Sequence, residues 1–154
     1  MREILFRAKA INRIEGLEYR TKYKNGDWMF GLLSKPYHDY NGYIQNAEMR
    51  NTDGVDGIEV DHETLGQYTG LTDKNGVKIF EGDIVKIYDS YDLAHGDVTD
   101  YQISKVFYFD GALCVEHYCS DYVFTVIGWI EDVEYEVIGN IYDNPELLGG
   151  DDHA

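Results

Sequence analysis

The stretch GQYTGLTDKNGVKIFEGDIVKIY, from Gly66 to Tyr88, contains three strand-like runs separated by two turn signals. The runs GQYTGL, VKIF and DIVKIY are rich in β-branched and aromatic residues, which favour strands. Between them lie Asp73-Lys74-Asn75-Gly76 and Glu81-Gly82-Asp83, and glycine, asparagine and aspartate reverse a backbone at the least cost. The stretch therefore predicts an antiparallel meander. Further strands are predicted before it and after it.

The sequence before the meander predicts two further strands. EILFRA, from Glu3 to Ala8, alternates in a period of two, and Asn25-Gly26 supplies the positive φ angles of a tight hairpin turn. After this turn, Trp28, Phe30 and Leu32 are expected to share one face of a strand.

The sequence after the meander contains three more β-rich runs, YQISKVFYF, ALCVEHYC and YVFTVIGWI. The final run, YEVIGNIYDNPELL, predicts a strand and a short helical turn that Asp143 or Asn144 caps and Pro145 begins. No helix-period segment of convincing length is present. Seven or eight short strands with Gly and Asn turns indicate a barrel or a sandwich.

Two segments have the composition of loops. Residues 35–57 are rich in Gly, Asn and Asp and show no sustained period, so we expect a long loop, the best location for variable function. Residues 89–100 form an acidic segment that contains Asp89, Asp92, Asp97, Asp100 and His95. Its spacing matches no calcium-loop pattern, so a solvated hairpin loop is the favoured interpretation over a Ca²⁺ or Mg²⁺ site.

Charge is distributed unevenly along the 154 residues, whose net formal charge is −16. Residues 1–52 carry nine bases and six acids, a charge of +3, whereas residues 53–154 carry four bases and 23 acids, a charge of −19. Such a field repels phosphate backbones, so direct nucleic-acid binding is disfavoured. The N-terminus has no secretory apolar region, and the longest apolar run, Phe124 to Ile130, is too short to cross a bilayer. We therefore expect a cytoplasmic protein without membrane association.

The sequence offers few groups for catalysis or metal binding. Cys114, His117 and Cys119 are zinc-ligand types, but on a strand Cys114 faces the side opposite to the other two. Buried structural thiols are therefore the favoured interpretation. No serine lies in a nucleophile-elbow motif, and Gly70 and Gly76 lack the spacing of a phosphate-binding loop. We predict no catalytic residue, no cofactor, no metal and no enzyme activity.

The polar residues of the meander have two interpretations. Gly76, Gly82 and the turn side chains are sufficiently explained by architecture. The functional alternative is an interaction surface, because exposed turns on a rigid scaffold often carry function. Its members are Tyr68, Thr69, Asp73, Lys74 and Asn75.

Four blocks of this sequence, REILFRAK, GDWMFGLL, VDHETLGQYTGLTDKNGVKIFEGDIVKIY and YEVIGNIYDNPELL, resemble the YopX protein family of bacteriophages and prophages. The resemblance implies a small, mostly β protein with an SH3-like barrel part and without an assigned activity, and it provides no functional residues to transfer. The segment between Leu33 and Val60 and the spacing before Trp28 depart from the usual pattern.

Together these observations predict a mainly β fold, an SH3-like small barrel with an added N-terminal β-hairpin and a short C-terminal helical turn. We expect a single domain over residues 1–148, with N-terminal strands in 1–34, the long loop in 35–57 and the barrel core in about 60–148. Residues 149–154 are expected to form a flexible acidic tail.

Two functional hypotheses remain open. The first is a phage accessory protein, located in the bacterial cytoplasm, that acts as a non-enzymatic protein-binding module and self-associates as a homo-oligomer. Tyrosine-rich loops favour it, because tyrosine is enriched at interfaces. The alternative is an acidic nucleic-acid mimic that occupies a host DNA-binding or defence protein. An enzyme would require a pocket that gathers His95, His117 or the acids.

Overall fold

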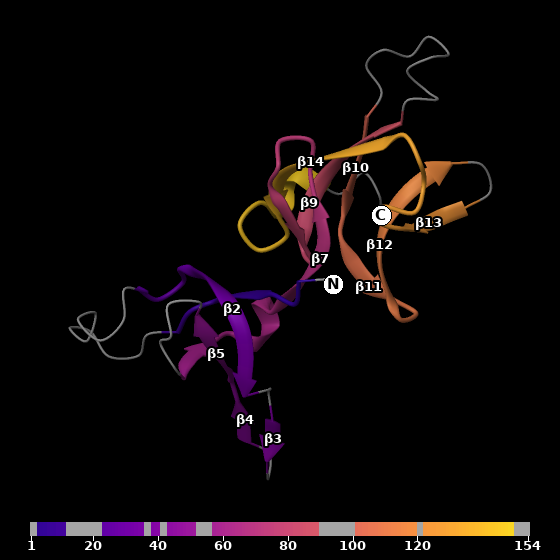
Figure 1. Ribbon diagram of the computed structural model, residues 1–154. Coiled ribbons are helices and arrows are strands. Elements are labelled where there is room, and N and C mark those ends of the chain that lie inside the picture. Colours follow the sequence, from indigo (N-terminus) through magenta and orange to yellow (C-terminus); the bar gives the residue numbers. More distant parts are fainter. Residues whose placement is uncertain are drawn as a thin grey trace. The chain divides into compact units, whose positions relative to one another are not determined.

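The computed structural model describes residues 3–11, 23–35, 38–40, 43–51, 57–89, 101–119 and 122–149. These divide into two compact units, Met1–Tyr68 and Thr69–Ala154, where the sequence predicted a single domain. The chain passes from one unit to the other within β7 (Gly66–Thr72), the first strand of the predicted meander. Each unit has its own hydrophobic core, so each is described by itself. Figure 1 labels most of the strands of both units.

The first unit is an antiparallel sheet with the strand order β6-β5-β2-β1-β7. A separate two-stranded ribbon, β3-β4, lies between β2 and β5 in the sequence. The elements are β1 (Phe6–Lys9), β2 (Trp28–Lys35), β3 (His38–Tyr40), β4 (Tyr43–Gln45), β5 (Ala47–Asn51), β6 (Ile58–Val60) and the 3₁₀ turn η1 (His62–Thr64).

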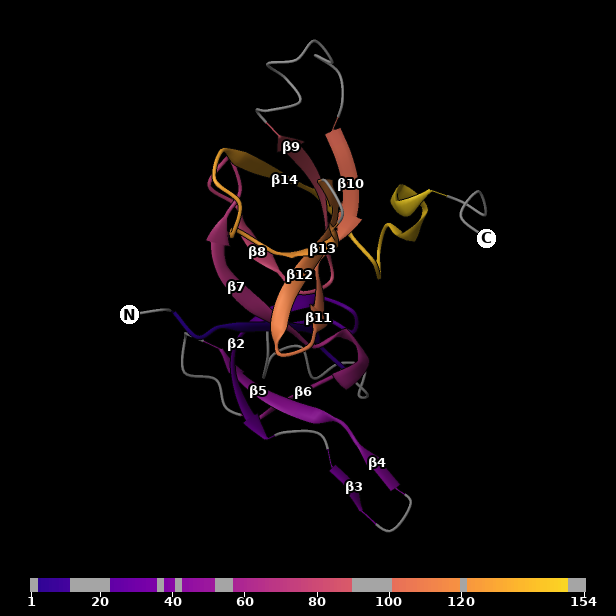
Figure 2. The same cartoon turned by 90° about the vertical axis from the view of Figure 1, so that its right-hand side faces the viewer.

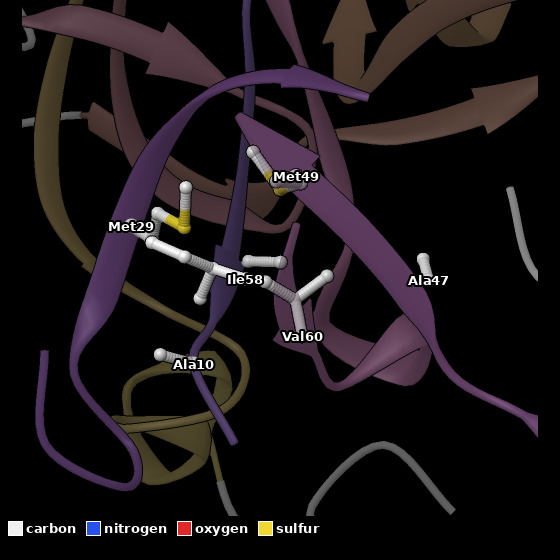
Figure 3. Close-up of a cluster of buried hydrophobic side chains, with 7 residues drawn as sticks. Ala10, Met29, Ala47, Met49, Ile58 and Val60 are labelled. Atoms are coloured by element: carbon white, nitrogen blue, oxygen red, sulfur yellow. The ribbon is translucent and has the colours of Figure 1, made fainter. Parts of the chain in front are cut away.

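One face of this sheet forms the core of the first unit. Register places Ala8 opposite Met29 and Met49 opposite both Leu33 and Ile58, so alternate residues of four strands point to the same side. Figure 3 shows Met29, Met49, Ile58 and Val60 of the buried cluster on neighbouring strands. The buried cluster consists of Ala8, Ala10, Met29, Ala47, Met49, Ile58 and Val60.

A turn is present at the predicted position, because the Asp27 amide donates to the Lys24 carbonyl and Gly26 has a φ of 88°. Asn25 has no positive φ, and β2 pairs with β1 instead of with the residues just before the turn, so the predicted tight hairpin is not formed. The prediction of a loop through residues 35–57 is wrong at β5, a strand within the sheet whose Met49 is fully buried. The sequence signal failed because AEMRN contains no β-branched residue and lies among turn formers. Its alternation of buried Ala47, Met49 and Asn51 is nevertheless that of a strand.

The second unit contains β8, which pairs with β7, and two three-stranded antiparallel sheets, β10-β9-β14 and β11-β12-β13 (Figure 2). The three predicted strands are present as β7, β8 (Lys78–Phe80) and β9 (Asp83–Asp89), joined by the two predicted turns. The prediction of an antiparallel meander is nevertheless wrong at its last step, because β8 pairs with β7 and not with β9, which lies between β10 and β14 in another sheet. The Phe80 amide donates to the Asp83 carboxylate at the second turn instead of to a β9 carbonyl. The remaining elements are β10 (Tyr101–Lys105), β11 (Phe107–Phe109), β12 (Ala112–Cys119), β13 (Tyr122–Val126), β14 (Val133–Asn140) and the 3₁₀ turn η2 (Pro145–Leu148).

The chain bends between β10 and β11 at Val106. Its amide donates to the Asp83 carbonyl at 2.8 Å, and its carbonyl accepts from the Gly82 amide at 2.8 Å. The run YQISKVFYF is therefore divided between the two sheets, with the fully buried Val106 at the junction. The core of the second unit consists of Ile79, Val85, Ile87, Val106, Val115, Ile127 and Tyr135.

The mainly β class is confirmed, but the SH3-like barrel is not. Among the described strands the sheets are open, and no closed barrel is formed. The predicted C-terminal turn is present as η2, with Pro145 in its first turn. Asn144 occupies the N-cap position, but its side chain makes no cap hydrogen bond. Residues 150–154, most of the predicted acidic tail, lie outside the described residues.

No helix of the described segments has the length and the apolar character needed to traverse a lipid bilayer.

Candidate functional site

The Asp73 side chain joins the turn between β7 and β8 to β14 through hydrogen bonds. Its carboxylate accepts hydrogen bonds from the amides of Asn75 (2.8 Å), Val77 (2.9 Å) and Val137 (2.9 Å). Burial acts to raise the pKa of Asp73, but these three amides and the Lys74 ammonium outweigh it, so the pKa is lowered from 3.8. The carboxylate is thereby fixed as an anion, and the turn holds Lys74 beside β14.

The structure separates the five residues of the predicted interaction surface. Tyr68 and Thr69 are buried, and the Thr69 hydroxyl donates to the Ile79 carbonyl at 2.8 Å. Asp73 is buried in its turn, whereas Lys74 and Asn75 are exposed. Only the last two can meet a partner directly, so the surface is not formed as the sequence predicted it.

Lys74 instead belongs to a larger surface on the sheet β10-β9-β14. Register places Tyr101 opposite Tyr88, Ile103 opposite Lys86, and Lys86 opposite Glu136, so these side chains share the face that points away from the core. Tyr101 and Ile103 remain 43% and 39% exposed. We call this surface the lysine–tyrosine face, and its members are Lys74, Lys86, Tyr88, Tyr101, Ile103 and Glu136.

Glu136 is the centre of a local polar network on this face. The Tyr88 hydroxyl donates to Glu136 Oε2 at 2.7 Å, and Lys74 Nζ lies 3.3 Å from the same oxygen. Lys74 Nζ also lies 4.4 Å from the centre of the Tyr88 ring, within the range of a cation–π contact. The three side chains therefore form one cluster in which each contacts the other two.

The second pair on the face repeats this arrangement. Lys86 Nζ lies 4.3 Å from the centre of the Tyr101 ring, and the Tyr88 and Tyr101 rings are 5.9 Å apart, centre to centre. Two lysines thus sit on two neighbouring tyrosine rings. The rings are held in place before any partner arrives, which reduces the side-chain entropy lost on binding.

The network shifts three ionisation equilibria. The hydrogen bond from Tyr88 and the nearby Lys74 lower the pKa of Glu136 against the opposing effect of desolvation. Partial desolvation acts to lower the pKa of Lys74, yet Glu136 raises it overall. Donation to Glu136, with desolvation, raises the pKa of Tyr88. All three shifts favour a lysine cation, a glutamate anion and a neutral phenol over a wide pH range.

The lysine–tyrosine face differs in charge from its surroundings. Residues 69–154 contain four lysines and 18 acids, a formal charge of −14. Three of those lysines lie on or beside this face: Lys74 and Lys86 are members, and Lys105 belongs to the same side of β10. The face therefore gathers three of the unit's four lysines beside two tyrosine rings, with Glu134, opposite Tyr88, and Glu136 among them.

Sequence reasoning identified Lys74 alone among these residues. The alternation of Lys86 and Tyr88 in DIVKIY placed both on the polar side of β9. The β14 partner depends on register across about 50 residues, and the β10 partners on register across the segment between β9 and β10; no local pattern specifies either.

The other sequence candidates form no site in the described part. Cys114 is buried, and burial together with Asp110 raises the pKa of its thiol. The side chains of His117 and Cys119, and residues 90–100 with most of the acidic segment, lie outside the described residues. Within the described ranges no three His, Cys, Asp or Glu side chains are grouped so that they could hold a metal ion.

Comparison with known proteins gives a consistent result. Residues 11–149 match the model of a family described as YopX protein. The chain is 34% identical over 137 residues, 88% of its length and 85% of the relative's, to the SPbeta prophage-derived uncharacterized protein YopX of Bacillus subtilis (strain 168).

Two crystal structures are also similar to this chain. YopX from Bacillus subtilis is 21% identical with a TM-score of 0.47, and protein EF1440 from Enterococcus faecalis is 28% identical with a TM-score of 0.49. Each comparison covers 96% of this chain and 99% of the other chain.

Proposed function

The chain belongs to the YopX protein family, and from that premise we propose that it is a phage accessory protein that acts as a non-enzymatic protein-binding module. The observation that supports this proposal is the lysine–tyrosine face, where Tyr88 and Tyr101 are held by Lys74 and Lys86. Ordered tyrosine rings provide large contact areas at a low cost in conformational entropy.

The charge of the face specifies the kind of partner it fits. Lys86 and Lys105 offer cations to a partner, whereas the rest of residues 69–154 is dominated by acids. A partner that presents carboxylates beside apolar side chains complements this face, and complementary charges increase the association rate and the specificity. A uniformly basic partner would instead be attracted to many positions on the unit.

The proposal is tested by isolating the partner with the full-length protein from lysogenic host cells and then measuring its affinity for purified variants. Lys86→Glu and Tyr101→Ala are each expected to weaken binding by about tenfold or more, as for residues at the centre of an interface. Val77→Ala is the control, because Val77 is 49% exposed on the turn and is no member of the face. Equal affinity of all three variants for the partner would refute the proposal.

The acidic charge of −14 on residues 69–154 supports the nucleic-acid mimic as a second candidate. Part of that charge is already engaged: Asp73 and Asp83 are buried in turns, and Glu136 is paired with Lys74. Competition separates the two candidates. Duplex DNA displaces the partner of a mimic, but it leaves a complex made through the lysine–tyrosine face intact.

A further inference from the structure

The second unit has a free sheet edge at β13. In the sheet β11-β12-β13, β13 pairs with β12 on one side, and no described strand pairs with its other side. The Ile127 amide donates to the Leu113 carbonyl at 3.0 Å, which fixes the phase of the antiparallel ladder between β12 and β13. Because this phase alternates along the strand, Thr125 directs its backbone groups towards β12, whereas Phe124 and Val126 direct theirs towards the free edge.

The free edge lacks the usual protection against pairing with another chain. The Val126 carbonyl accepts from the Trp129 amide at 3.1 Å, but the Val126 amide and both backbone groups of Phe124 have no partner in the described part of the chain. Soluble proteins protect such edges with charged side chains, proline or bulges. The five residues of β13, YVFTV, include neither a charge nor a proline, and the register shift of this pair lies on β12, between Glu116 and Cys119.

The other edges of the two three-stranded sheets are protected, as far as the described strands show. On β14, the Val137 amide donates to the Asp73 carboxylate and the Tyr135 carbonyl accepts from the Lys74 amide, each at 2.9 Å. The edge strand β10 carries Lys105, and β11 is only three residues long. Charge and short length are both protective features. Among these edges, β13 is therefore the one that accepts another strand.

A buried hydroxyl on β13 indicates which strand this is. Thr125 lies opposite Val115 on the core side of the sheet and is 8% exposed, yet its hydroxyl has no hydrogen-bond partner among the described residues. Buried polar groups in native structures are normally satisfied, because leaving one without a partner costs free energy. Two threonines that face each other in a non-hydrogen-bonded antiparallel pair have Cα atoms about 4.5 Å apart, and their hydroxyls bond after rotation about the Cα–Cβ bond.

We infer that β13 of one chain pairs with β13 of a second copy in antiparallel register, with Thr125 opposite Thr125 of that copy. Phe124 then lies opposite Val126, and the outward backbone groups of both residues bond across the edge. The contact is isologous, since a two-fold axis passes through the threonine pair. An uncharged strand pairs with itself without bringing like charges together, and the second copy supplies the hydroxyl that Thr125 lacks.

The pairing also covers apolar surface. Phe124 and Val126 lie on the side of the sheet away from the core and are 44% and 38% exposed. The Phe124 ring already packs against Phe107 and Phe109, with ring centres 5.6 Å and 5.4 Å apart. Exposed apolar clusters of this kind on a soluble protein mark interaction sites. Self-pairing joins the clusters of the two copies, and it involves no member of the lysine–tyrosine face, so it goes beyond the proposed function.

The experiment exchanges charges across the pair in the full-length protein. The variants are Phe124→Lys/Val126→Lys and Phe124→Glu/Val126→Glu, and Val77→Lys, at a position 49% exposed on a turn, is the control. In the inferred register, position 124 of one copy faces position 126 of the other. Two copies of one double variant therefore bring like charges together, whereas one copy of each brings unlike charges together.

We expect analytical ultracentrifugation to show dimers for the unaltered protein and the control. Each double variant alone should have a dissociation constant raised by about tenfold or more. An equimolar mixture of the two should form a heterodimer, which native mass spectrometry identifies by its mass. Circular dichroism checks that the fold is retained.

A second pair of variants is independent of charge and replaces a double variant that fails to fold. Val126→Pro removes an amide that points to the free edge and leaves the bonds to β12 in place, whereas Val126→Thr keeps that amide. The proline variant should be monomeric and the threonine variant dimeric.

Four results would each overturn the inference: a monomeric unaltered protein, double variants that dimerise as tightly as the control, a mixture without heterodimer, or equal dimerisation of Val126→Pro and Val126→Thr. All of these variants retain Lys86 and Tyr101. Their affinity for the partner of the lysine–tyrosine face is measured separately, so either proposal can fail while the other holds.

Discussion

At the scale of single residues, Asp73 shows how one side chain can define a turn and position a neighbour. Its carboxylate satisfies three backbone amides, two within the turn and one on β14, some 64 positions away in the sequence. The sequence motif Asp-Lys-Asn-Gly correctly predicted a turn, in which Asp73 bonds the local backbone. The bond to Val137 could not be predicted, because it depends on the packing of β14 beside that turn.

Replacement of Asp73 by asparagine is expected to destabilise the protein by about 2 kcal/mol at neutral pH. The side-chain oxygen of the new asparagine can still accept from the backbone amides of Asn75 and Val77. Its NH₂ group would then face the backbone amide of Val137, and two donors cannot form a hydrogen bond with each other. Urea denaturation measures the difference in the free energy of unfolding.

The pH dependence of that difference follows from the lowered pKa of Asp73. A carboxyl whose folded pKa lies below its unfolded value contributes stability above the unfolded value, and this contribution is lost as the pH falls through the folded pKa. The difference between wild type and Asp73→Asn should therefore be constant well above 3.8 and shrink in more acidic solution. A difference that does not change down to about pH 2 would contradict this role.

Glu136→Gln tests the network on the lysine–tyrosine face. The hydrogen bond to Glu136 is the main cause that raises the pKa of Tyr88, so the substitution should lower this pKa towards the ordinary value of 10.0. The ring signals of Tyr88, followed by NMR during a pH titration, report the change. Glu134→Gln is the control, because Glu134 lies opposite Tyr88 without that hydrogen bond. An unchanged Tyr88 pKa in Glu136→Gln would mean that the hydrogen bond does not form in solution.

At the scale of elements, prediction succeeded where turn chemistry and alternation were both local. The strands and turns from β7 to β9, the Asn25-Gly26 turn and the shared face of Trp28, Phe30 and Leu32 are all present. The pairing of β9 was predicted wrongly, because it joins β10 and β14 and not β8. Prediction failed at β5, whose residues have weak strand propensity and become a strand through pairing with β2 and β6. The bend at Val106 was also missed, since YQISKVFYF contains no Gly or Pro to indicate it.

Met49→Ala tests the assignment of β5 as a central strand. Met49 is fully buried between β2 and β6, so its truncation should cost about 2–5 kcal/mol of unfolding free energy, the range for large-to-small core substitutions. Leu32→Ala, on the exposed side of the neighbouring strand, should cost less than about 1 kcal/mol. If urea denaturation showed equally small losses of unfolding free energy for Met49→Ala and Leu32→Ala, the assignment of β5 as a central strand would be contradicted.

At the scale of the whole molecule, charge is divided along the chain in a way that the sequence already displayed. Residues 1–52 carry +3, but the first unit as a whole, residues 1–68, carries −2, and residues 69–154 carry −14. The sequence could not show that Lys74 and Lys86 would gather over Tyr88 and Tyr101, or that aromatic residues would remain exposed on β11 and β13. These arrangements result from strand register and from the division into two units, which are properties of the folded chain.

The measurement that tests the proposed function most directly is site-specific photo-cross-linking in lysogenic cells. A benzophenone amino acid replaces Tyr101 in one full-length variant and the exposed Val77 in another. We predict that irradiation links Tyr101-substituted protein to a discrete partner protein, and that the Val77-substituted protein gives no such product. Identical products from both positions, or products from neither, would contradict a binding role for the lysine–tyrosine face.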